Sequence, residues 1–124
     1  GLKEKLGAWR GRIDAALDRF LPSGELPPVP LHRAMRYAVG PDVDLLLDIH
    51  RRLAPMHAID LANALAEFEP YWFEEPCQSE NVEALAEVRR ATTIPVVTGE
   101  ALYARSGFRP IFRERALFIW LHHE

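Results

Sequence analysis

Three short apolar segments, each ending at an acidic residue, limit what this chain can fold into more than any other feature. The segments span residues 43–49, 71–73 and 94–98. Each is too short for a helix and is bounded by helix-breaking residues, as is typical of buried parallel strands. Asp48, Glu74 and Glu100 stand at their C-terminal ends, and each acid follows the previous one by 26 residues. A spacing of 26 residues has room for one strand and one helix, so the pattern predicts repeated βα units.

Helical periodicity fills the intervals between these segments, with apolar residues recurring every three or four positions. The expected helices lie between Pro55 and Pro70, at residues 80–92 and at residues 103–115. Two more helices are expected before the first strand, at residues 2–20 and 31–39. Strands that alternate with helices indicate a parallel sheet with right-handed crossovers. The fold class is therefore α/β.

The length of 124 residues limits how much of a closed barrel the chain can hold. A complete eight-stranded (β/α) barrel takes about 250 residues. We therefore expect a partial (β/α) barrel of about three βα units, preceded by one or two helices. The expected organisation is an N-terminal helical segment at residues 1–38, the partial barrel at 39–116 and a tail at 117–124.

Composition excludes several classes of function. Fifteen basic residues against eighteen acidic ones give a net charge of -3, which argues against nucleic acid as a partner. The apolar runs are only a few residues long, so we expect no membrane span. Cys77 is the only cysteine, which excludes an internal disulfide and suits the reducing cytoplasm. It follows Pro76 and has no evident histidine partner, so we interpret it as a packing residue.

The three acids suggest a metal site. Adjacent parallel strands bring their C-terminal ends to one edge of the sheet, where α/β proteins place their sites. Carboxylates that converge there repel one another unless a cation lies among them, and such hard oxygen ligands suit Mg²⁺. The alternative is that Asp48, Glu74 and Glu100 are unrelated acids near helix N-termini, where the helix dipole favours negative charge. Spacing alone leaves both interpretations open.

The residues around the acids resemble a known family. Asp48-Ile49-His50, Phe73-Glu74-Glu75-Pro76 and the segment 94–100, Ile-Pro-Val-Val-Thr-Gly-Glu, are similar to the third, fourth and fifth strands of the enolase superfamily. The resemblance is to its mandelate racemase-like branch, and most closely to acid-sugar dehydratases such as galactonate dehydratase. It covers residues 38–116, close to two-thirds of the chain.

This resemblance implies a Mg²⁺-dependent dehydratase of a sugar acid. Asp48, Glu74 and Glu100 match the metal ligands of the family, in which the first Glu of the Glu-Glu-Pro motif binds the metal. Glu75 is then a neighbour of the site. His50 matches the general acid that protonates the departing hydroxyl, and residues i and i+2 of a strand share a face, so it would lie beside the metal. Arg51 and Arg52 either meet a substrate carboxylate or are solvated.

Other parts of the family pattern do not occur in these residues. The strands that supply the general base and the domain that covers the substrate are missing, so we expect little turnover by the 124 residues alone. Residues 1–37 resemble instead the N-terminal helices of short-chain isoprenyl diphosphate synthases, without that family's phosphate-binding and Asp-rich motifs. A chimeric or truncated chain would combine both resemblances. The sugar acid and its stereochemistry are not specified by the sequence.

A non-catalytic role is the alternative. Open strand edges favour self-association, and the apolar face of the helix at residues 2–20 offers a helical partner surface. A truncated fragment that keeps the three acids and acts at most as a self-associating module would have these properties. Either way, we expect a homo-oligomer.

Overall fold

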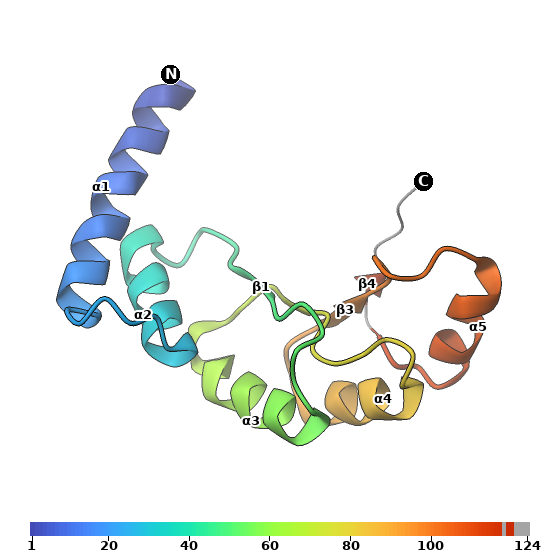
Figure 1. Cartoon of the computed structure of the whole chain (residues 1–124). Helices are drawn as coiled ribbons and strands as arrows, with labels where there is room; N and C mark the ends of the chain where they lie inside the picture. The colour runs from blue at the N-terminus through green and yellow to red at the C-terminus, as the bar shows by residue number, and fades with distance from the viewer. Residues whose placement is uncertain (118, 121–124) are drawn as a thin grey trace. The chain divides into compact units, whose positions relative to one another are not determined.

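The computed structural model describes residues 1–117 and the backbone of residues 119 and 120. The chain divides into two compact units, Gly1–Asp44 and Leu45–Glu124 (Figure 1). The first consists of helices, and the second contains the strands that carry the predicted site. No helix in the described part of the chain combines the length and the apolar character that crossing a bilayer requires.

The first unit is a pair of packed helices, α1 (Leu2–Phe20) and α2 (Pro28–Val39). The predicted bounds of α1 are confirmed, whereas α2 begins three residues earlier than predicted, because a proline in the first turn already has the φ angle of a helix. The buried residues of this pair are Ala16, Leu21, Ala34 and Ala38. Only the C-terminal half of the apolar face of α1 packs against α2, since Leu2 and Leu6 in the N-terminal half are 72% and 51% exposed.

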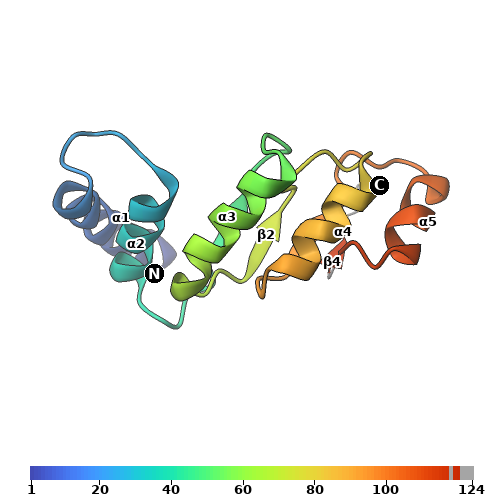
Figure 2. The ribbon, with the colours of Figure 1, turned by 90° about the horizontal axis from the view of Figure 1, so that it is seen from below.

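The second unit alternates strands with helices, as the 26-residue spacing predicts. Its elements are β1 (Leu46–Asp48), α3 (Pro55–Leu65), the 3₁₀ helix η1 (Ala66–Phe68), β2 (Trp72–Glu74), α4 (Val82–Ala91), β3 (Val96–Thr98), α5 (Arg105–Arg113) and β4 (Ile119–Trp120). The strands of the described residues are parallel and pair in the order β1-β2-β3-β4. Figure 2 shows α3, α4 and α5 side by side on one face of this sheet. The α/β fold and the partial barrel are thereby confirmed.

The fourth strand was not predicted from the sequence. Residues 117–124 were expected to form a tail, but Val97 pairs with Ile119 and Thr98 with Trp120, which extends the parallel sheet by one strand. A strand of two residues is too short to produce a recognisable alternation of apolar and polar residues, so only its pairing with β3 defines it. Residues 118 and 121–124 of the predicted tail lie outside the described residues.

The alternation of side chains along the strands builds the core and separates it from the site. Leu47 pairs with Phe73, and both are buried. In the next pair, the Asp48 side chain is 50% exposed and Glu74 is half-buried. Because successive side chains of a strand point to opposite faces, burial of the first pair against the helices turns the second pair to the other face. The largest fully buried apolar side chains of this unit are Phe73, Leu65, Leu85, Ile111, Val88, Val96 and Val97.

Replacement of Phe73 tests this arrangement. Phe73→Ala removes a ring that is 0% exposed, so we expect unfolding free energy to fall by about 3–5 kcal/mol from lost burial and the cavity left behind. Urea denaturation followed by circular dichroism measures the change. Met56→Ala, at a side chain that is 64% exposed, is the control and should change stability by no more than about 0.5 kcal/mol. Equal effects of the two substitutions would contradict the core described here.

Candidate active site

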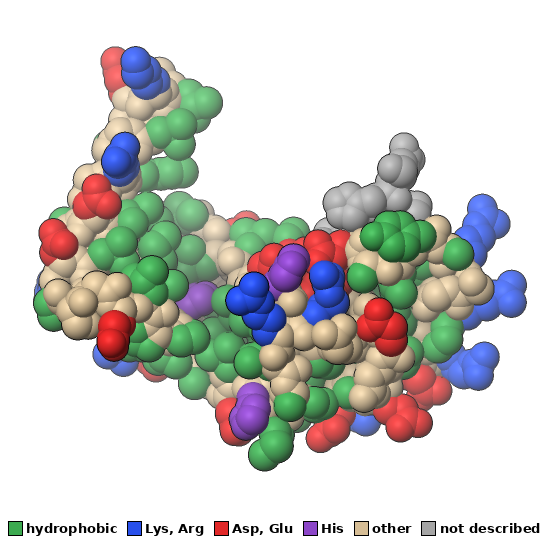
Figure 3. Space-filling view, in the orientation of Figure 1, with side chains coloured by type: hydrophobic (Ala, Val, Ile, Leu, Met, Phe, Trp, Pro, Cys, Tyr) green, Lys and Arg blue, Asp and Glu red, His purple; other side chains and the backbone are tan. Residues whose placement is uncertain are grey.

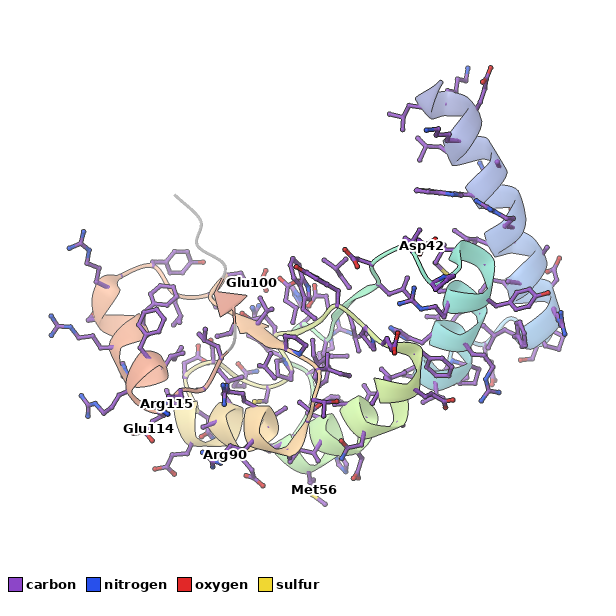
Figure 4. All side chains as sticks on the ribbon, turned by 180° about the vertical axis from the view of Figure 1, so that it is seen from behind. Asp42, Met56, Arg90, Glu100, Glu114 and Arg115 are labelled. Atoms are coloured by element: carbon purple, nitrogen blue, oxygen red, sulfur yellow. The ribbon has the colours of Figure 1, made fainter. Side chains whose placement is uncertain are left out.

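The three predicted metal ligands lie at the same edge of the sheet. Asp48 and Glu74 are the last residues of β1 and β2 and are direct partners in the parallel register, and Glu100 follows the end of β3 by two residues. Acidic, basic and histidine side chains gather on the molecular surface in this region (Figure 3). Figure 4 shows Glu100 on the opposite side of the sheet from Arg90, which belongs to helix α4. The carboxyl ends of adjacent strands thus bring together acids that lie 26 residues apart in sequence.

His50 lies beside these carboxylates, but not for the reason inferred from the sequence. The strand ends at Asp48, and His50 and Arg51 have left-handed backbone angles, with φ of 56° and 63°. The backbone N–H of His50 donates a hydrogen bond of 2.8 Å to Asp48 Oδ1. Its ring Nδ1 lies 4.0 Å from Asp48 Oδ2 and 3.7 Å from Glu100 Oε1. A tight turn, rather than the alternation of an extended strand, places the imidazole between two of the acids.

The electrostatics of Glu74 show that the acids are crowded. Partial burial raises the pKa of the Glu74 carboxyl above its ordinary value, and the negative charge of Asp48 raises this pKa further. Glu100 and Glu75 act in the same direction. Both causes disfavour the ionised form, because burial removes water from the charge and like charges repel. This edge of the sheet therefore favours a cation.

Arg51 is the cation that the structure places there. Its Nη1 donates a hydrogen bond of 2.5 Å to Glu100 Oε1 and lies 3.8 Å from Glu75 Oε2. The hydrogen bond to Glu100 is the main reason that the pKa of the guanidinium is raised, so it stays charged. The sequence left two roles open for Arg51, contact with a substrate carboxylate or simple solvation. The Arg51 side chain is only 24% exposed and pairs with two acids, so the prediction of simple solvation is wrong for this arginine.

Glu75, which sequence reasoning left outside the site, is fully buried beneath it. Its Oε1 accepts hydrogen bonds of 2.8 Å from Thr98 Oγ1 and 2.9 Å from the backbone N–H of Gly99. Glu75 follows the last residue of β2 and has a left-handed φ of 47°, so strand alternation in the sequence does not predict where its side chain lies. Through these two hydrogen bonds Glu75 links the residue after β2 to the end of β3.

The donor set fits Mg²⁺, which binds through carboxylate oxygens and retains several water molecules. Asp48, Glu74 and Glu100 offer hard oxygen ligands and excess negative charge from three neighbouring strand ends. As their side chains stand, no three His, Cys, Asp or Glu residues within the described ranges are close enough together to hold a metal ion. In this arrangement Glu100 is paired with Arg51.

Cys77 behaves as the packing residue inferred from the sequence. It is buried, and burial raises the pKa of its thiol to about 11, with smaller contributions from the charges of Glu75 and Glu87. A thiol with such a pKa is protonated near neutral pH and is a poor nucleophile.

Comparison with known sequences supports what this geometry indicates. The sequence model of the family described as Enolase C-terminal domain-like matches residues 29–121. The chain belongs to this family. The match begins inside helix α2, whereas the resemblance noted from the sequence began at residue 38.

Curated relatives of the chain include dehydratases. A D-galactonate dehydratase family member from Pseudarthrobacter chlorophenolicus is 34% identical over 99 residues, which cover 80% of this chain and 22% of that protein. One from Streptomyces bingchenggensis is 45% identical over 67 residues, or 54% of this chain and 16% of the relative. A D-mannonate dehydratase from Sphingomonas is 43% identical over 70 residues, which cover 56% of this chain and 17% of that protein. The chain thus spans less than a quarter of the length of these three relatives.

Solved structures agree with the sequence comparison. A mandelate racemase/muconate lactonizing enzyme-like protein from Roseovarius has a TM-score of 0.73 at 41% identity, covering 76% of this chain and 24% of its own. A protein of the same description from Rubrobacter xylanophilus has a TM-score of 0.70 at 40% identity. The match covers 77% of this chain and 26% of that protein. The mandelate racemase-like fold is confirmed. The similarity of residues 1–37 to isoprenyl diphosphate synthases gains no support from these proteins.

The crowding of the carboxylates predicts how stability depends on pH in metal-free buffer. Since the folded-state pKa of Glu74 lies above its unfolded value, the contribution of this group is fully present below the unfolded pKa and is lost as pH rises through the folded pKa. Glu74→Gln removes that loss. We therefore expect the variant to be more stable than the wild type at pH 7, with the difference shrinking as pH falls below about 4.

Urea denaturation at a series of pH values in the presence of a chelator measures this effect. Glu67→Gln, at an exposed residue of η1, is the matched control and should show no such pH-dependent difference from the wild type. A stability difference for Glu74→Gln that is independent of pH would contradict the charge crowding.

Proposed function

We propose that Asp48, Glu74 and Glu100 bind Mg²⁺ and that the chain contributes this metal centre, together with His50, to a sugar-acid dehydratase. The observation that carries the proposal is the pairing of Asp48 with Glu74 in the parallel register, beside a third carboxylate on the neighbouring strand end. Such clustered acids destabilise one another without a cation, as the raised pKa of Glu74 indicates.

The chemistry of dehydration explains why a metal centre belongs there. A proton next to a carboxylate is too weakly acidic for an ordinary side-chain base. Bound Mg²⁺ supplies the positive charge that stabilises the negative charge developing on the substrate carboxylate as this proton leaves. The contribution of this chain is to hold three carboxylates on rigid strand ends, which keeps the charge in a fixed position relative to the substrate.

His50 is suited to the role of general acid. Its ring Nδ1 lies 4.0 Å from Asp48 Oδ2 and 3.7 Å from Glu100 Oε1, beside the carboxylates proposed to bind the metal. A protonated imidazole can donate its proton to the departing hydroxyl group of the substrate. The side chain is 58% exposed, so a substrate entering from solvent can reach it.

The substrate class rests on the relatives. A D-galactonate dehydratase family member aligns with 80% of this chain and a D-mannonate dehydratase with 56% of it. We extend their substrate class, sugar acids, to the protein that contains this chain.

A non-catalytic, self-associating module is the second candidate, and the exposed apolar residues of α1 favour it. Leu2 is 72% exposed and Leu6 51% exposed, on a helix face that the packing with α2 leaves uncovered. Analytical ultracentrifugation together with Mg²⁺ titration separates the two candidates. An oligomer that binds Mg²⁺ and a sugar acid supports the enzyme, whereas an oligomer that binds neither supports the module.

Thermal unfolding tests the metal site. Ligands that bind only the folded state stabilise it by mass action, so Mg²⁺ at about 100 times its Kd should add about 2.7 kcal/mol. We expect Glu74→Gln to abolish this increment, because a neutral amide replaces one of the charged ligands. Glu67→Gln is the control and should respond like the wild type. Equal Mg²⁺ shifts for the wild type and Glu74→Gln would exclude the site.

His50→Asn tests the general acid. At saturating Mg²⁺ and aldonic acid, in an enzyme with a complete barrel that includes these residues, the variant should form 2-keto-3-deoxy product about 10²–10⁴-fold more slowly than the wild type. Its Mg²⁺ affinity should stay within about threefold, because His50 is not a proposed ligand. Detection of the keto-deoxy acid by mass spectrometry measures the rate. Unchanged product formation in His50→Asn would exclude the role.

A further inference from the structure

Glu75 carries a buried oxygen that the fold leaves without a hydrogen bond. Its Oε1 accepts from Thr98 and Gly99, whereas its Oε2 is inaccessible to solvent and receives no hydrogen bond from the described residues. A buried carboxylate oxygen without a donor is unfavourable, so native structures usually supply one. The cationic Nη1 of Arg51 lies 3.8 Å from this oxygen.

Arg51 stands between two carboxylates and fully satisfies only one of them. The same Nη1 that lies 3.8 Å from Glu75 Oε2 donates at 2.5 Å to Glu100 Oε1. The backbone of Arg51 is anchored on the Glu75 side, because its N–H donates 2.7 Å to the Glu75 carbonyl and its own carbonyl accepts 3.2 Å from Gln78 Nε2. A small rotation of the side chain toward Glu75 would therefore exchange one partner for the other.

We propose that Arg51 is a movable counter-ion of the metal site, which pairs with Glu100 when no metal is bound and transfers to the buried Oε2 of Glu75 when Glu100 turns to Mg²⁺. Glu75 is then a positioning residue that acts through Arg51. This inference rests on the metal site proposed above and concerns how that site exchanges one cation for another.

Three properties make the exchange favourable. The guanidinium remains charged under all ordinary conditions, so it needs an anion in both states. Glu75 cannot compete with Glu100 for the metal, because its Oε1 is held by Thr98 and Gly99 and its side chain is fully buried. Transfer of Arg51 also gives Glu75 Oε2 the hydrogen bond that it lacks. The exchange would thus give a partner to the one buried oxygen of Glu75 that the described residues leave without a hydrogen bond.

Mg²⁺ titration calorimetry on four proteins tests the proposal: the wild type, Arg51→Met, Glu75→Gln and the double variant. Arg51→Met removes the competing cation and should bind Mg²⁺ about tenfold more tightly. Glu75→Gln keeps the oxygen that accepts from Thr98 and Gly99 but removes the second anionic partner of Arg51. It should therefore weaken binding severalfold. In the Arg51→Met background, the same change should have little effect, because Glu75 acts through Arg51.

A general field effect of Glu75 predicts a different result. If its charge attracted Mg²⁺ directly, Glu75→Gln would weaken binding by the same factor in both backgrounds, and that outcome would overturn the proposal. The ¹⁵Nε NMR signal of Arg51 gives an independent measurement. It should shift when Mg²⁺ is added to the wild type, and this shift should be smaller in Glu75→Gln. An Arg51 signal that does not respond to saturating Mg²⁺ would also overturn the proposal.

Further variants separate failure of this proposal from failure of the metal site. If Glu74→Gln abolishes Mg²⁺ binding while Arg51→Met leaves it unchanged, the metal site stands and the role of Arg51 is wrong. If neither the wild type nor Arg51→Met binds Mg²⁺, both proposals are wrong. Should Arg51→Met fail to fold by circular dichroism, Arg51→Gln provides a second neutral side chain with the same expectation. Arg51→Lys keeps the charge and should bind Mg²⁺ like the wild type.

Discussion

The parallel pairing of β1 with β2 is the constraint on which the rest of the site depends. It sets Asp48 directly beside Glu74, and the next strand end adds Glu100 to the same edge. The result is a concentration of negative charge that the protein cannot relieve by moving the backbone, because burial of Leu47 and Phe73 against the helices fixes the register. A cation must compensate this charge, and Arg51 and the proposed Mg²⁺ are two ways to do so.

The two glutamates of the Glu-Glu-Pro motif show how the end of a strand gives adjacent identical side chains different roles. Alternation along the strand sends Glu74 to the face away from the helices, where its pKa rises in the company of other acids. The chain turns directly after the strand, where Glu75 has a φ of 47°, and the Glu75 carboxylate is buried beside Thr98, Gly99 and Arg51. One glutamate is available to a ligand, and the other organises the residues beneath it.

Family membership and local geometry support different parts of the functional conclusion. The match over residues 29–121 establishes the family and the fold, and the relatives suggest sugar acids as substrates. The chain nevertheless covers only 22% of the Pseudarthrobacter relative, with which it aligns over 99 residues. The activity of a whole enzyme is therefore a proposal. The electrostatics of the strand ends belong to this chain itself. They make the metal site the part of the function that its own residues support best.

The sequence by itself determined the α/β alternation, the parallel sheet and the identity of the strand-end acids. The apolar periodicity and the 26-residue spacing can be read from the sequence directly, because the apolar residues of each helix or strand must be buried in the folded chain. Tertiary structure decided what depends on partners distant in sequence. β4 is too short to produce a pattern, so only its pairing with β3 defines it. The turn at His50 brings its ring between Asp48 and Glu100, which belong to separate βα units. Arg51 likewise pairs with an acid from another βα unit. Periodicity reports which face of an element is buried, whereas the competition among neighbouring charges is settled only when the folded strands bring those charges together.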